Sequence, residues 1–275
     1  MTTGIIAGVV TPHTPRMAVE AKAPDFLRGV IAGSYALGEA LRALEPDLLV
    51  LMSAHWVTTF PWYATRHARH TGVCIADEAP DMFDGIAYDR PGDPAFADAL
   101  IEAIAATGRP AGRNDNPHYH WDYATCVPLQ YLDPDETLPV VTLGTCLMAD
   151  LDECFEIGEI VARTAQASGR RVVFIASCAF AHDILRGPEK WPPEDQMAAD
   201  RDFIALLTDG RIAEAKAGFP DYAARVKAEM GGRLIATMLG TLDDTGGTAY
   251  AGETYGDYGQ SSGSGNISLA VRPLS

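Results

Sequence analysis

The chain has 275 residues, of which 47% are hydrophobic, enough for one large domain or two small ones around a substantial core. Its formal net charge of -16 comes from acidic residues scattered along the chain, which argues against nucleic acid because phosphates attract basic patches. No apolar stretch reaches the roughly 18 residues of a membrane span and the N-terminus shows no secretory signal, so we expect a cytoplasmic protein that does not bind membranes.

Four short runs are apolar and rich in β-branched residues, which is typical of strands buried on both faces. They are residues 5–10 (IIAGVV), 47–52 (DLLVLM), 138–144 (LPVVTLG) and 171–177 (RVVFIAS). Between them, apolar residues at helical spacing predict helices over 26–44, 94–107 and 151–168, the last ended by Gly169. Strands that alternate with helices predict an α/β fold, a single domain over residues 1–275 with a largely parallel central sheet flanked by helices.

The composition of the chain changes after Ser177. Helical patterns follow over 194–208, 211–217 and 221–242, so the C-terminal portion is predicted to be helical. A glycine-rich tail comes next, GETYGDYGQSSGSGN at 252–266, and we interpret it either as a flexible loop or as a lid that folds over a ligand. The chain carries no phosphate-binding glycine motif, so we expect no nucleotide cofactor.

The five cysteines form no CxxC pair and their number is odd. They are Cys74, Cys126, Cys146, Cys154 and Cys178. This pattern favours reduced thiols in the core over a disulfide framework or a structural zinc site.

Three of the predicted strands lead into a histidine. The run 5–10 leads to His13, the run 47–52 to His55, and the run 171–177 to His182. One histidine beside an apolar run is more often structural than a ligand, but parallel strands bring their carboxyl ends to one edge of the sheet, where ligands bind. Two imidazoles there make half of a site for Fe(II), Zn(II) or Mn(II), which then needs a carboxylate or a third nitrogen.

Several residues are candidates for the missing ligand. Glu229 precedes a small, apolar helical segment, although an acid in that place also complements the helix dipole. His118 and His120, in HYHWDY, would lie on one side of an extended segment. His67 and His70 lie in an arginine-rich stretch, where we expect a solvated surface.

Six motifs, in this order and at these separations, are fairly specific for one superfamily. They are TPHTPRM near the start, SAHW at 53–56, DYATCVPLQYL at 122–132, ASCAFAHDI at 176–184, AEMGGRLIATMLGTL at 228–242 and QSSGSGNISLAVRPL at the end. With them the chain resembles the class III extradiol ring-cleavage dioxygenases, the superfamily of the protocatechuate 4,5-dioxygenase catalytic subunit. The likeness is greatest to the branch of homoprotocatechuate 2,3-dioxygenase and 2-aminophenol dioxygenase.

The resemblance implies roles for particular residues. His13, His55 and Glu229 match the ligands of Fe(II), with Glu253 in reserve for Glu229, and His182 matches an acid/base histidine.

Tyr123 stands where many relatives carry histidine in a DHG motif, and its phenol can hydrogen-bond to a substrate oxygen or to dioxygen. His120 and His118 either orient the substrate or only hydrogen-bond to the backbone. Arg16 either neutralises a substrate carboxylate or is an ordinary surface arginine.

The implied activity is cleavage of a catechol, such as one like 3,4-dihydroxyphenylacetate, by O2 to a ring-opened semialdehyde. The partners are then a small aromatic substrate, O2 and further copies of the chain in a homo-oligomer. Three alternatives stay open: a 2-aminophenol as substrate, which suits Tyr123, a zinc-dependent hydrolase, since two histidines and a glutamate also suit Zn(II), and a non-enzymatic binding module. The intact set of candidate residues argues against the last.

Overall fold

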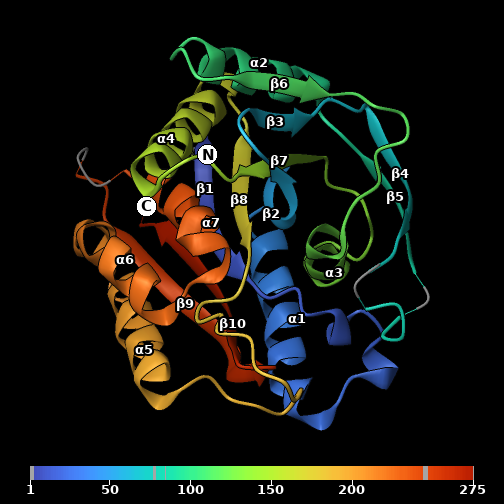
Figure 1. The fold of residues 1–275 in the computed structure, drawn as a ribbon. Helices are drawn as coiled ribbons and strands as arrows, with labels where there is room; N and C mark the ends of the chain where they lie inside the picture. The colour runs from blue at the N-terminus through green and yellow to red at the C-terminus, as the bar shows by residue number, and fades with distance from the viewer. Residues whose placement is uncertain (1–2, 77–78, 84, 244–246, 275) are drawn as a thin grey trace.

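The computed structural model describes residues 3–76, 79–83, 85–243 and 247–274. An eight-stranded sheet forms the centre, with strand order β6-β3-β7-β2-β8-β1-β10-β9, and helices cover both of its faces (Figure 1). This arrangement confirms the predicted α/β fold with a mostly parallel sheet.

The four predicted strands form the middle of the sheet and pair in parallel. They are β1 (Gly4–Thr11), β2 (Leu48–Thr58), β7 (Val140–Cys146) and β8 (Arg171–Ser177). Every residue of β7 is buried, as expected of a strand with helices on both faces. Because these strands run in the same direction, their carboxyl ends all open at one edge of the sheet.

The tail at 252–266 is neither a flexible loop nor a separate lid. It forms most of a hairpin of β9 (Tyr250–Ser261) and β10 (Ser264–Pro273), and β10 pairs antiparallel with β1. The two turn residues, Ser262 and Gly263, have φ values of 53° and 86°, the left-handed backbone that a two-residue hairpin turn needs. The glycines that predicted a loop are therefore hairpin residues.

Four further strands carry too weak a pattern to be predicted. They are β3 (Trp62–Thr65) and β6 (Ala111–Asn114) at the other edge of the sheet, and β4 (Arg69–Cys74) and β5 (Ile86–Pro91), which form a separate hairpin.

The helices lie in two layers. The α-helices are α1 (Arg28–Arg42), α2 (Pro94–Ala105), α3 (Tyr123–Leu132), α4 (Leu151–Ser168), α5 (Glu194–Thr208), α6 (Ile212–Val226) and α7 (Arg233–Gly240). The described residues also form short 3-10 turns: η1 (Pro15–Met17), η2 (Glu20–Lys22) and η3 (Asp25–Leu27) between β1 and α1, and η4 (Glu229–Gly232) between α6 and α7. Residues of α1 and α3 build the core on one face of the sheet, and residues of α2, α4, α6 and α7 build the core on the other. None of the helices in the described ranges has the length and apolar character to cross a membrane.

Helices α1, α2, α4 and α5 confirm their predictions to within a few residues. The segments predicted over 211–217 and 221–242 are largely helical too, but the boundary between them is wrong. Pro220 lies inside α6, which continues to Val226. The chain then breaks where Lys227 and Met230 adopt positive φ values of 49° and 51°. This break, rather than the proline, separates α6 from α7, and Glu229 lies within it.

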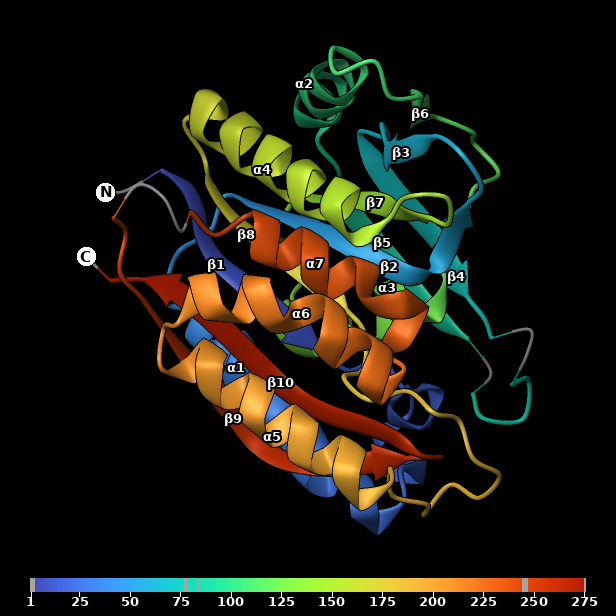
Figure 2. The ribbon, with the colours of Figure 1, turned by 60° about the vertical axis from the view of Figure 1, so that its left-hand side comes forward.

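Helices α4 and α7 pack against each other at two glycines, and Figure 2 shows them side by side over the sheet. A Cβ atom on Gly158 of α4 would lie 2.1 Å from the carbonyl oxygen of Thr237. A Cβ atom on Gly240 of α7 would lie 2.1 Å from the carbonyl oxygen of Phe155. The two backbones therefore approach too closely for any side chain at these positions.

We expect Gly158→Ala to destabilise the protein by about 1–3 kcal/mol, because the added methyl group forces α4 away from α7. Gly218→Ala is the matched control: Gly218 lies inside α6 with nothing near its would-be Cβ atom, so alanine should stabilise the protein by about 0.5–1 kcal/mol through helix propensity. Urea unfolding of both variants measures the difference. Equal effects of the two substitutions would contradict close packing at Gly158.

Candidate metal centre

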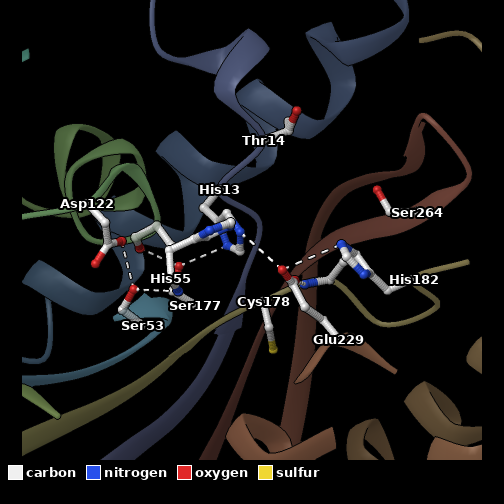
Figure 3. Close-up of polar contacts among 12 residues, drawn as sticks. His13, Thr14, Ser53, His55, Asp122, Ser177, Cys178, His182, Glu229 and Ser264 are labelled. Atoms are coloured by element: carbon white, nitrogen blue, oxygen red, sulfur yellow. Dashed lines mark hydrogen bonds and ion pairs between the residues drawn. The ribbon is translucent and has the colours of Figure 1, made fainter. Parts of the chain in front are cut away.

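A cavity of about 280 Å³ opens at the carboxyl ends of the central strands. It is lined by His13, Thr14, Pro15, Arg16, His55, Met82, Tyr123, Ala179, His182, Ile184, Glu229, Ser261, Ser262, Ser264 and Asn266. The three histidines that were predicted to meet at this edge therefore share one cavity, and Glu229 joins them (Figure 3).

His13, His55 and Glu229 form a set that can hold a metal ion. Each offers one ligand atom, and these atoms lie within 4.8 Å of one another. Nε2 of His13 is 3.4 Å from Oε1 of Glu229, and the rings of His13 and His55 meet edge to face at 5.1 Å. A first-row divalent ion bonds histidine nitrogen and carboxylate oxygen at about 2.0–2.2 Å, so small side-chain adjustments let all three reach one ion.

Ser177 fixes the orientation of His13. The Ser177 hydroxyl donates its hydrogen to the carbonyl oxygen of Ala124 at 2.5 Å, and its oxygen lies 3.2 Å from Nδ1 of His13. With its hydrogen already committed, the hydroxyl acts as acceptor, so Nδ1 of His13 carries the proton. Nε2, which faces Glu229, is then the free lone pair that a metal requires.

Glu229 is oriented by the backbone of the loop after β8. The Ala179 amide donates to Oε2 at 2.7 Å and occupies one carboxylate oxygen, so that Oε1 turns toward His13 and His182. The glutamate is buried, with 6% of its side chain exposed. The break between α6 and α7 allows this placement, because it directs the first residue of η4 into the cavity instead of along a helix.

His55 is placed by an irregularity in β2. The register of β2 against β7 shifts between Ser53 and Val57, and Ser53 Oγ accepts hydrogen bonds from the amides of His55 and Trp56 at 3.1 and 3.2 Å. The same hydroxyl donates to Asp122 at 2.7 Å. A bulge of this kind re-aims side chains at the end of a strand, and here it turns the imidazole toward His13.

The two buried residues of the set, His13 and Glu229, shift each other's pKa. Burial alone would lower the pKa of His13, but the charge and hydrogen bond of Glu229 outweigh it and raise that pKa above 6.5. Burial alone would raise the pKa of Glu229, but His13, His182 and the Ala179 amide bring that pKa down to about 2. The carboxylate is therefore ionised throughout the neutral range and ready to bind a cation.

Two predicted catalytic residues lie beside the set without belonging to it. Nε2 of His182 is 3.5 Å from Oε1 of Glu229, and 30% of its side chain is exposed to the cavity side. Tyr123 is the first residue of α3, and its ring centroid is 4.2 Å from that of His55 and 5.7 Å from that of His13.

Other predicted residues lie elsewhere. His118 and His120 are exposed and do not line the cavity; a Cβ atom on Gly72 of β4 would lie 3.1 Å from Nδ1 of His120. Glu253, the reserve ligand, lies on β9, where Arg272 and Tyr255 contact its carboxylate.

The expectation of a solvated surface at His70 is wrong. This residue is 4% exposed, its Nε2 lies 3.1 Å from the carbonyl oxygen of Val140, and its ring packs on Trp121. Burial lowers the pKa of His70 to about 4, so the ring is neutral. Arg69, beside it in the sequence, is exposed because β4 buries alternate residues. His67 is half-buried, with Nε2 at 3.0 Å from the Asn116 carbonyl oxygen.

The turn of the β9–β10 hairpin forms one wall of the cavity. One interpretation of this segment placed it over a ligand, but sequence reasoning missed that it is a strand hairpin of the central sheet. Ser261, Ser264 and Asn266 line it, and Ser261 Oγ is hydrogen-bonded to Thr14 Oγ1 at 3.0 Å. This bond ties the hairpin to the residue after His13. The serines and asparagine of QSSGSGN indicated a polar site, because such residues are unusual in a buried strand. The glycines of the same sequence indicated a loop instead.

All five cysteines are buried and free, as predicted.

Comparisons with known proteins agree on one family. The family model described as the catalytic LigB subunit of aromatic ring-opening dioxygenase matches residues 7–272. A 3,4-dihydroxyphenylacetate 2,3-dioxygenase of Escherichia coli is 21% identical over 84% of this chain and 87% of its own length. The alpha and beta subunits of a 2-aminophenol 1,6-dioxygenase of Pseudomonas sp are each 25% identical, over 83% and 82% of this chain and 85% and 81% of their own.

A solved structure shares the fold. The crystal structure of an uncharacterized protein from Escherichia coli K12 superposes with a TM-score of 0.69, covering 96% of this chain and 99% of that one at 18% identity.

We expect Glu229→Gln to lower divalent-metal affinity by at least about 10-fold, because the amide removes the only carboxylate of the set. Glu253→Gln is the matched control and should bind metal as the unaltered protein does, since Glu253 lies outside the cavity. Anaerobic titration with Fe(II) or Zn(II), followed by metal analysis of the desalted protein, gives both affinities. Equal loss in the two variants would rule out the assigned site.

Proposed function

Because the chain belongs to the family of catalytic LigB subunits of aromatic ring-opening dioxygenases, we propose that it cleaves a catecholic ring with O2 at an Fe(II) ion held by His13, His55 and Glu229. The product is a ring-opened semialdehyde that contains both oxygen atoms. One observation carries the proposal: two imidazoles and one carboxylate converge in a cavity that leaves room for other ligands. Two histidines and one carboxylate are the ligand set of non-haem Fe(II) oxygenases.

Fe(II) at this site would supply what the side chains lack, a redox-active centre that lets triplet O2 react with a singlet aromatic ring. Glu229 contributes the only negative charge among the three ligands, so a divalent centre keeps a net positive charge. That charge favours a catechol bound as its anion. Ser177 and the Ala179 amide would hold His13 and Glu229 in place while substrate enters.

His182 would act as the acid/base group. It would take a proton from a substrate hydroxyl when the catechol binds and return it later in ring cleavage. The imidazole would therefore end the reaction in the protonation state in which it began. Its place in the cavity lining, 3.5 Å from Glu229 Oε1 but outside the three-residue set, supports this role. Tyr123 would hydrogen-bond to a ring oxygen or to dioxygen.

Arg16 supports a substrate that bears an anionic substituent. It lines the cavity from η1, three residues after His13, and in the described part of the chain no hydrogen bond or ion pair engages its guanidinium. A carboxylate on the ring's side chain would satisfy it, as in the 3,4-dihydroxyphenylacetate that the Escherichia coli relative is named for. His120 as a substrate-orienting residue stays a prediction, since it lies outside the cavity lining.

A 2-aminophenol is the second candidate substrate. The two Pseudomonas subunits are named for such a compound, and Tyr123 suits that branch as well as the homoprotocatechuate branch. An amine in place of one hydroxyl would use the same metal ligands. The preference between a catechol and a 2-aminophenol would then depend on whether His182 takes its proton from a hydroxyl or from an amine.

Anaerobic reconstitution with Fe(II), followed by admission of air in the presence of catechols and aminophenols, tests the proposal. We expect oxygen uptake and a yellow ring-opened product, with carboxylate-bearing catechols turned over best and with Zn(II) inactive in place of Fe(II). Activity that needs neither air nor Fe(II) would point instead to a zinc-dependent hydrolase. Failure to retain any metal would point to a binding module.

Removal of the His182 imidazole should separate metal binding from turnover. In His182→Gln we expect the iron content to be retained and kcat to fall by about 10²–10⁴-fold, the usual contribution of a positioned acid/base group. In His13→Ala and His55→Ala both iron and activity should be lost. Loss of iron in all three variants alike would show that the division of roles is wrong.

A further inference from the structure

One carboxylate outside the metal centre is completely buried and has no cationic partner. Asp200, on α5, is 0% exposed, and no ion pair joins it to a lysine or arginine among the described residues. Its partners are three hydrogen-bond donors: the Ala181 amide at 3.1 Å, the Tyr222 hydroxyl at 2.8 Å and the Tyr258 hydroxyl at 2.5 Å. Three donors from three different segments therefore converge on one side chain.

A buried carboxylate is expensive to keep. Burial raises the pKa of Asp200, and the hydroxyls of Tyr258 and Tyr222 and the Ala181 amide oppose that rise. Replacement of a buried charged group by apolar residues of similar volume is often neutral or stabilising, so stability alone gives little reason for this arrangement. Besides accepting hydrogen bonds from Tyr222 and Tyr258, Asp200 fixes the position of one backbone amide, that of Ala181.

Ala181 immediately precedes His182, and the backbone of this pair is held from both sides. The Gly265 amide donates to the Ala181 carbonyl at 2.8 Å, and the His182 amide donates to the carbonyl of Val226, the last residue of α6, at 3.2 Å. A Cβ atom on Gly265 would lie 2.5 Å from Asp200 Oδ2, so the hairpin approaches the carboxylate as closely as a glycine allows. Of these three partners of the Ala181–His182 backbone, Gly265 and Val226 contribute main-chain groups, and Asp200 contributes a side chain.

The position of the His182 imidazole depends mainly on the backbone of Ala181 and His182, whereas His13 and Glu229 are oriented by contacts to their side chains. Ser177 orients His13 through its ring, and Ala179 orients Glu229 through its carboxylate. Among the residues that the structure describes, the His182 ring makes a polar contact with Glu229 alone, at 3.5 Å, and 30% of the side chain is exposed. We propose that Asp200 is a positioning residue, which holds the His182 imidazole beside Glu229 by fixing the backbone of Ala181.

The inference rests on the proposed function, since it assumes that His182 transfers the proton. A merely structural Asp200 would be equally buried, because it also ties α5 to α6 and β9 through Tyr222 and Tyr258. The two roles differ in what a substitution changes. A structural residue affects the stability of the whole domain, whereas a positioning residue changes the place of one imidazole in a domain that stays folded.

Asp200→Asn, compared with Asp202→Asn, separates the two roles. Asp202 is exposed on the same helix, so its variant controls for the loss of one charge from α5. In Asp200→Asn we expect kcat per bound iron to fall about 10–100-fold, as misplacement of a reacting group by an ångström can do, with KM and iron affinity unchanged. The control should match the unaltered protein in all three.

Nuclear magnetic resonance of the metal-free protein provides a readout that needs no activity. The chain has 7 histidines, and the ring signals of His182 are identified by their loss in His182→Gln. In Asp200→Asn these signals should shift or broaden while those of the other histidines stay in place. Tyr258→Phe removes one donor to Asp200 without touching Ala181, and it should cause a smaller change of the same kind. It also keeps the test decisive if Asp200→Asn does not fold.

The proposal is overturned if Asp200→Asn and Tyr258→Phe lower Tm while kcat per iron, KM and the His182 signals stay as they were. If the unaltered protein opens no aromatic ring, the proposed function fails by that result alone. The ring signals of His182 would still decide whether Asp200 positions it.

Discussion

The candidate metal centre depends on one buried carboxylate that faces two imidazoles. Glu229 comes from a break in the chain between α6 and α7, and its Oε1 lies 3.4 Å from His13 and 3.5 Å from His182. Without a metal, the charge and hydrogen bond of Glu229 raise the pKa of His13, and His13, His182 and the Ala179 amide lower that of Glu229. A divalent cation held by His13, His55 and Glu229 would meet a carboxylate that is already ionised. The negative charge that would attract a cation is thus present in the metal-free protein.

Each side chain at the centre is aimed by a group that is not itself a ligand. Ser177 selects the tautomer of His13, the Ala179 amide occupies one oxygen of Glu229, and Ser53 holds the bulge that turns His55. All of these groups are at or just beyond the ends of parallel strands, whose buried middles are rigid. The sheet therefore provides a fixed base, and short polar contacts set the directions.

The parallel strands and the meeting of His13, His55 and His182 could be predicted, because β-branched runs identify buried strands and parallel strands share one edge. Glu229 as a ligand needed the family likeness, since its helical pattern concealed the break that exposes it. Contacts such as Ser177 with His13 join residues far apart in the chain and leave no local signal. The β9–β10 hairpin was missed because its glycines and serines mask the alternation that identifies a strand.

The position of that hairpin has a consequence for biosynthesis. Strand β10 pairs with β1, the first strand of the chain, and its turn supplies a wall of the cavity that begins at His13. During synthesis, His13 is therefore made long before the hairpin residues that enclose its cavity. A truncated chain that lacks the hairpin would therefore leave the cavity without the wall formed by Ser261, Ser264 and Asn266.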